Sequence, residues 1–174
     1  MKKRKIILFD GYGSGININM TRYYEQTKGK KRVYDDVPKK RIKRTTLLSS
    51  VRLDGTLAYT FFQGVLNRKI FLDYIRNILV PTLNEGDIVI MDNLNCHKVK
   101  GVAEAIEAAR VSVLYLPPYS PDMNPIEIIC SKIKFLLRKW KARSSEVLNR
   151  FIEKAFLAVT TENIDHWFSA CGYY

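Results

Sequence analysis

The sequence predicts an α/β protein whose mixed sheet is covered by helices on both faces. Strand-like segments with a hairpin signal come first, and the rest of the chain alternates short apolar runs with amphipathic helical segments. Hairpins build antiparallel pairs, whereas strands separated by helices build parallel ones, so both kinds are expected in one sheet. With 174 residues, 47% of them hydrophobic, the chain can bury one sizeable core. We therefore expect residues 1–174 to form a single domain.

The first part of the chain carries the antiparallel strand signals. Residues 5–10 (KIILFD) form a short apolar run that ends in an aspartate and enters the glycine-rich loop GYGSG. β-Branched residues favour strands over residues 18–24 and 45–53. Asp54-Gly55 is a strong hairpin signal before LAYTFFQGVL. These segments predict three antiparallel strands.

The rest of the chain predicts alternating helices and strands. Apolar residues at helical spacing follow Asn67 and stop before Pro81, which predicts one amphipathic helix. We then expect a buried strand, an alanine-rich helix, a second strand, a helix opened by Pro125, and two terminal helices with serine and threonine caps. Their ranges are 87–92, 98–109, 111–116, 125–141 and 145–170.

Three acidic residues lie at ends of these elements. Asp10 ends the first strand, Asp92 ends residues 87–92, and Glu127 lies in the first turn of the helix that Pro125 opens. Ligands of open α/β sheets collect outside the carboxyl ends of the strands, so these acids are expected to converge. Mg²⁺ requires such oxygen ligands, and two ions together clamp both oxygens of a phosphodiester displacement. Glu127 also has a local alternative, because it stands three residues after Asn124 in the pattern of a capping box.

Two motifs carry a resemblance to a known family. MDN-x-x-x-HK at residues 91–98 and LPPYSPD-x-NPIE at residues 116–127, with 34 residues between Asp92 and Glu127, resemble the catalytic domain of the mariner-like DDE transposases, in their bacterial insertion-sequence branch. The resemblance covers nearly the whole chain. It implies a ribonuclease H-like fold and DNA cleavage and joining with two Mg²⁺ or Mn²⁺ ions, with Asp10, Asp92 and Glu127 as catalytic and metal-binding residues.

Positive charge indicates a nucleic-acid partner. The chain has 29 basic and 17 acidic residues, a net charge of +12, which points to a polyanion such as DNA. Basic residues gather over residues 28–44 and after Glu127, where phosphate contact is expected. The residues expected to contact DNA are Arg41, Arg44, Lys132, Lys134, Arg138, Lys139 and Lys141. Asn93 and His97 are expected to support the site, although a lone histidine in a loop is more often structural.

The preferred hypothesis is a transposase catalytic domain that acts on the ends of its element and on target DNA. The alternatives are an inactive DNA-binding relic, which the loop GYGSG after Asp10 favours, and a ribonuclease H-like nuclease without end joining. Only nine residues precede Asp10, so we expect no N-terminal helix-turn-helix module, an upstream helix-turn-helix product as partner, and a possible homodimer. No apolar run reaches the roughly 18 residues of a membrane span. We expect a cytoplasmic, nucleoid-associated protein with no membrane contact.

Overall fold

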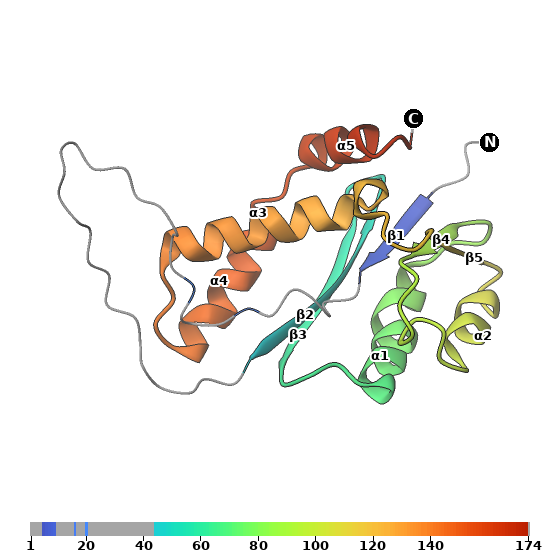
Figure 1. The fold of residues 1–174 in the computed structure, drawn as a ribbon, viewed down its shortest axis with the longest axis horizontal. Coiled ribbons are helices and arrows are strands. Elements are labelled where there is room, and N and C mark those ends of the chain that lie inside the picture. The colour runs from blue at the N-terminus through green and yellow to red at the C-terminus, as the bar shows by residue number, and fades with distance from the viewer. Residues whose placement is uncertain (1–4, 10–15, 17–19, 21–43, 174) are drawn as a thin grey trace.

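A five-stranded mixed sheet forms the centre of the protein (Figure 1). The computed structural model describes residues 5–9, 16, 20 and 44–173. The strands are β1 (Lys5–Phe9), β2 (Thr45–Arg52), β3 (Leu57–Gln63), β4 (Ile88–Met91) and β5 (Ser112–Tyr115). Their order is β3-β2-β1-β4-β5. The pairs β1–β2 and β2–β3 are antiparallel, whereas β1–β4 and β4–β5 are parallel, which confirms the predicted mixed sheet.

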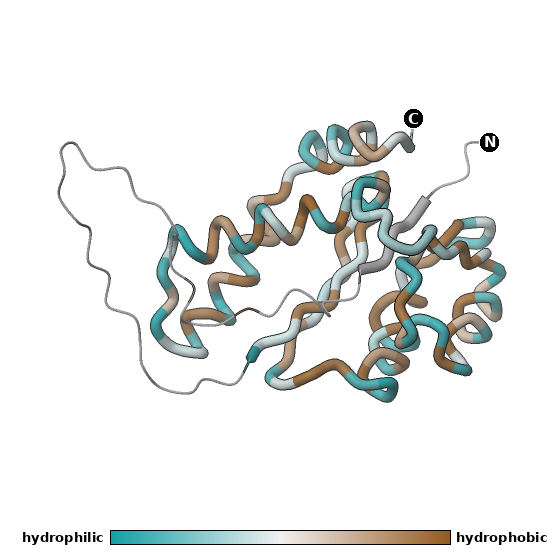
Figure 2. The backbone as a smooth tube through the Cα atoms, in the orientation of Figure 1, coloured by the Kyte–Doolittle hydropathy of each residue, from teal (hydrophilic) through white to brown (hydrophobic). Residues whose placement is uncertain are grey.

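Helices cover both faces of this sheet, as predicted. The α-helices are α1 (Arg68–Tyr74), α2 (Val102–Glu107), α3 (Pro125–Trp140), α4 (Ser145–Leu157) and α5 (Thr161–Ala170). In Figure 1, α1 and α2 lie on one side of the strands, and α3, α4 and α5 on the other. Figure 2 shows hydrophobic and hydrophilic residues alternating along α3, as a helix with one buried face requires.

The strands divide their apolar residues between two cores because successive side chains point to opposite faces. In β4, Ile90 joins the core under α3, α4 and α5, while Val89 and Met91 join the core under α1 and α2. Leu47 and Leu48 of β2 are divided in the same way. Both cores therefore fix β4, and with it the residue that follows Met91.

The helix after Asn67 forms as predicted, but its backbone changes along its length. The Asn67 side chain caps it by accepting a hydrogen bond from the Ile70 N–H at 2.9 Å. The α-helical part ends at Tyr74 and continues as a π-helix (Ile75–Leu79) and then a 3₁₀ turn (Val80–Thr82) that contains Pro81.

The alanine-rich helix is shorter than predicted. The sequence pattern favours residues 98–109, and α2 spans only Val102–Glu107. The reason is Gly101, which has a φ of 97° and therefore cannot belong to a right-handed helix. Residues 98–100 consequently belong to the connection between β4 and α2 and do not form the first turn of α2.

The two terminal helices have the predicted caps. Ser144 accepts a hydrogen bond from the Val147 N–H, and Thr160 forms a capping box with Asn163. Within the described part of the chain, no helix is long and apolar enough to cross a membrane. The strand expected over residues 18–24 falls, apart from residue 20, outside the described residues, as do the loop GYGSG, Asp10 and Arg41.

Candidate active site

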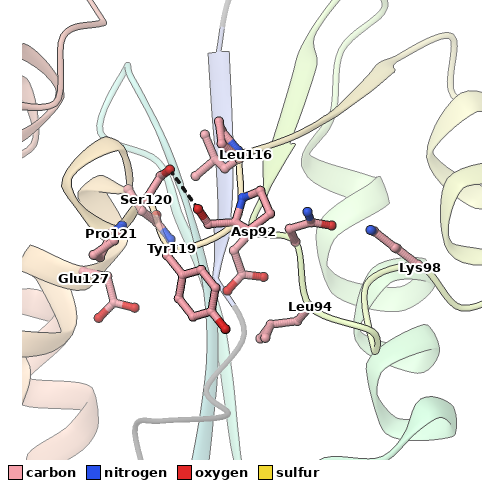
Figure 3. A pocket seen from close by; sticks show the side chains of 12 residues that line it. Asp92, Leu94, Lys98, Leu116, Tyr119, Ser120, Pro121 and Glu127 are labelled. Atoms are coloured by element: carbon pink, nitrogen blue, oxygen red, sulfur yellow. Dashed lines mark hydrogen bonds between the residues drawn. The ribbon is translucent and has the colours of Figure 1, made fainter.

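A cavity opens at the edge of the sheet where β4 and β5 end (Figure 3). Its volume is about 430 Å³. One wall is the loop that follows β4, and the other is the proline-rich loop between β5 and α3 together with the first turn of α3. The lining residues are Asp92, Asn93, Leu94, Lys98, Leu116, Pro117, Pro118, Tyr119, Ser120, Pro121, Asn124 and Glu127. The structure thus brings the predicted Asp92 and Glu127 to one cavity.

His97 holds Asp92 from the protein side. The imidazole is fully buried and stacks on the Phe71 ring, with 4.7 Å between the centroids. Its Nδ1 lies 3.1 Å from the Asp92 carbonyl oxygen and 2.5 Å from the Asp92 Oδ1. The carbonyl is the better aligned acceptor, since Oδ1 has no well-formed hydrogen bond within the described residues. His97 is buried and contacts Asp92 from the side away from the cavity, whose lining it does not join.

Glu127 is placed by the start of α3. Pro125 occupies the first helical position, and the buried Asn124 caps the helix by accepting from the Ile126 N–H at 3.3 Å. A capping box would need the Glu127 carboxylate on the Asn124 N–H, but that N–H donates to the Pro121 carbonyl at 3.1 Å. The carboxylate instead projects into the cavity (Figure 3). The capping-box alternative is therefore not what the structure shows.

The two carboxylates influence each other electrostatically. Desolvation raises the pKa of Glu127, the Lys134 ammonium lowers it, and the negative charge of Asp92 raises it further. Glu127 is exposed as a residue, so solvent screens these effects on its pKa. Two mutually repelling carboxylates at one opening favour binding of a cation.

The donor set suits a hard divalent cation. Besides the two carboxylates, the buried Oδ1 of Asn93 has no hydrogen-bond partner among the described residues. Oxygen donors of this kind fit Mg²⁺ or Mn²⁺ rather than a softer metal. No group of three or more acidic, histidine or cysteine ligands occurs within the described part of the chain. β1 ends at Phe9, beside the end of β4, and the predicted third ligand Asp10 follows it outside the described residues.

Two cavity residues were not singled out by the sequence. Lys98 lies across Asp92 from Glu127, with its Nζ 5.8 Å from the centre of the Tyr115 ring. Tyr119 stands in the proline-rich loop with its ring at the mouth of the cavity. The motif MDN-x-x-x-HK contained the only signal for Lys98, and nothing in the sequence distinguished Tyr119 from the other tyrosines.

The predicted basic residues of α3 divide between two sides of the helix. At 3.6 residues per turn, Lys134 and Arg138 fall within about 20° of Glu127 around the axis, whereas Lys132 and Lys139 fall more than about 100° away. The Lys132 ammonium contacts the Asn163 side chain and lies 5.5 Å from the Trp167 ring. Lys141 is the C-cap of α3, and the exposed Arg44 immediately precedes β2.

The chain belongs to the DDE superfamily endonuclease family, which it matches over residues 6–149. A comparison with curated proteins gave no match.

Solved structures define the fold further. This chain is similar to the transposase in a Mos1 paired-end complex with the left transposon end, with a TM-score of 0.76 and 16% sequence identity. The match covers 95% of this chain and 51% of the Mos1 chain. The Mos1 catalytic domain with Raltegravir and Mn gives 0.64 at 15% identity, with coverages of 95% and 76%. A simian T-cell lymphotropic virus intasome with a PP2A regulatory subunit gives 0.57 at 11% identity, with coverages of 85% and 46%. The mixed α/β fold is that of ribonuclease H-like transposase catalytic domains. The chain spans about half the length of the first Mos1 chains that it matches.

Proposed function

We propose that this chain is the catalytic domain of an insertion-sequence transposase, which cleaves DNA and joins the cut ends to a target with the help of two Mg²⁺ or Mn²⁺ ions. The observation that carries the proposal is the convergence of Asp92 and Glu127, two carboxylates that repel each other, on one open cavity of a DDE-family fold. Mos1 structures have been solved with Mn and with Mg, which supports the choice of metal.

Asp92, Glu127 and, by the sequence motif, Asp10 would hold the metal. The bound metal would supply activation of a water or a 3′ hydroxyl and stabilisation of the leaving oxygen. The protein's own contribution is positioning: the buried His97 fixes Asp92, and the Asn124 cap together with Pro125 fixes the turn that carries Glu127. This places carboxylates from a strand end and a helix start on opposite walls of the cavity.

DNA would approach along α3 and across the cavity. Lys134 and Arg138 continue the line of Glu127 along the helix, and Lys98 stands on the other side of Asp92. Cations on both sides of the acids suit a phosphate backbone that crosses the site. We further propose that the protein acts on DNA in the cytoplasm, associated with the nucleoid.

Plasmid nicking in the presence of Mg²⁺ or Mn²⁺ tests the proposal. We expect the parent protein to nick supercoiled DNA. Asp92→Asn should reduce this activity by more than about a hundredfold, because loss of a direct metal ligand should reduce activity more than loss of a residue that only supports a ligand, which costs about 10- to 100-fold. Asp122→Asn is the matched control, since Asp122 is exposed on the proline-rich loop and does not line the cavity. Equal nicking by the parent and Asp92→Asn would refute the assignment.

A second arm separates the transposase from its alternatives. Short duplexes with a free 3′ hydroxyl are incubated with a target plasmid, and joined products are counted. Joining that requires Asp92 supports a transposase. Nicking without joining supports a ribonuclease H-like nuclease, and DNA binding without either reaction supports the inactive relic.

The path along α3 makes a separate prediction. The affinity of the double variant Lys134→Ala/Arg138→Ala for duplex DNA should depend less steeply on salt than that of the parent. The slope of log affinity against log salt concentration should become shallower by about 0.9 for each phosphate that the variant no longer neutralises. Lys139→Ala, on another side of the same helix, should leave the slope close to that of the parent. Fluorescence anisotropy at several salt concentrations measures both slopes, and equal slopes for the two variants would exclude this path.

A further inference from the structure

Tyr119 has a backbone conformation that its neighbours do not explain. Three described residues other than glycine have a positive φ: Arg110, Tyr119 and Lys141. Arg110 follows the end of α2 and Lys141 is the C-cap of α3, where left-handed residues are common. Tyr119 lies in a loop, with a φ of 58°, and an aromatic residue there is a true outlier. Strain of this kind gathers at functional sites.

The loop holds the Tyr119 ring away from the protein. The residue is fully exposed, at 101% of the reference area, so packing does not fix its side chain. The backbone does, because Pro117, Pro118 and Pro121 restrict the residues around it and the Ser120 hydroxyl lies 3.5 Å from the Pro118 carbonyl oxygen. A large apolar ring that a rigid loop presents to solvent is suited to an external partner.

The ring stands where a substrate would enter. In Figure 3 it projects across the opening between the carboxylates of Asp92 and Glu127. The adjoining wall of the cavity is apolar and includes Leu116 and Pro118. Leu116 and Pro118 offer no polar side chain to a phosphate, whereas the flat face of a nucleobase can pack against them. Bases of unpaired strands stack on exposed aromatic rings in this way.

We propose that Tyr119 stacks on an unpaired nucleobase next to the phosphate that reacts at the Asp92–Glu127 site. This inference rests on the proposed function, since it assumes that the cavity acts on DNA. The ring stabilises the end of a strand whose base has left the duplex, and it contributes to positioning rather than to the chemistry.

The test compares three duplexes of one sequence: blunt, with one unpaired 3′ nucleotide, and with an abasic nucleotide at that position. Binding to the full chain is measured by fluorescence anisotropy with Mn²⁺, and 2-aminopurine at the unpaired position reports stacking directly. Tyr119→Phe keeps the ring, and Tyr119→Asn removes it while tolerating the left-handed backbone. Thermal melting checks that both variants fold.

For the parent and Tyr119→Phe, we expect about tenfold tighter binding of the unpaired base than of the abasic end, with quenched 2-aminopurine fluorescence. Tyr119→Asn should bind the two ends equally and should not quench. If Tyr119→Asn keeps the preference while Asp92-dependent nicking is intact, the stacking role is wrong and the proposed function stands. If the parent binds none of the duplexes, both fall together.

Discussion

Two aspartates flank the same strand and have opposite surroundings. Asp87 precedes β4, is 2% exposed, and accepts hydrogen bonds from the Arg52 guanidinium at 2.6 Å and the Asn84 N–H at 2.7 Å. Asp92 follows β4, is 28% exposed, and faces an open cavity beside Glu127. Asp87 therefore holds the fold together, whereas Asp92 is left with bonding capacity for a ligand. The difference shows that an acid identifies a site by the end of the strand at which it lies together with the partners it has.

The largest expected effect is on stability at Asp87. Asp87→Ala leaves the buried Arg52 guanidinium without its close and buried charge partner, which typically costs about 3–5 kcal/mol in the free energy of unfolding. Asp54→Ala is the control, because Asp54 lies 3.8 Å from Arg52 and is 47% exposed, where an ion pair contributes about 0–1 kcal/mol. Urea denaturation measures both. Similar losses for the two variants would contradict the structural role of Asp87.

The next effect concerns the support of Asp92. His97→Phe keeps a ring stacked on Phe71 but removes the nitrogen that contacts Asp92. We expect Mn²⁺ affinity to fall about 10- to 100-fold, as for other outer partners of metal ligands. Calorimetric titration measures it, with thermal melting alongside. Unchanged affinity in a folded variant would show that His97 only fills space.

The sequence predicted the elements of this site better than its details. β4 and α3 follow from an apolar run and from Pro125 with its helical period, both of which are local signals. The burial of His97 depends on Phe71, which lies 26 residues earlier in the chain and packs from α1. Sequence reasoning could not decide between a structural and a site role for His97, because that depends on this long-range contact.

Other details depend on backbone geometry that composition does not reveal. The alanine-rich pattern before α2 favoured a longer helix, and the left-handed Gly101 overrides it. Glu127 fitted a capping box by spacing, but the Asn124 N–H bonds to Pro121 instead. Nothing in the sequence indicated the left-handed backbone of Tyr119, because the conformation of the whole proline-rich loop determines it.

A smaller effect is expected at Glu127. Desolvation and Asp92 raise its pKa above the unfolded value, so the ionised carboxylate destabilises the folded state as pH rises through the folded pKa. Glu127→Gln should therefore stabilise the metal-free protein near pH 7 by less than about 1 kcal/mol, because solvent screens the exposed group. This gain should vanish below about pH 4, where glutamate is protonated in both states. Urea denaturation of both proteins at the two pH values measures this difference in the free energy of unfolding. A Glu127→Gln variant that is less stable than the parent at neutral pH would contradict the prediction.

The central claim is that Asp92 and Glu127 form a divalent-cation site, and thermal melting over a Mn²⁺ titration tests it most directly. For the parent, we expect the melting temperature to rise with Mn²⁺, corresponding to about 2.7 kcal/mol when the free ion reaches a hundred times its dissociation constant. Asp92→Asn should melt no lower than the parent without metal, since it removes the repulsion of Glu127, and should not respond to Mn²⁺. Asp122→Asn should respond as the parent does. A Mn²⁺ response of Asp92→Asn equal to that of the parent would contradict the account.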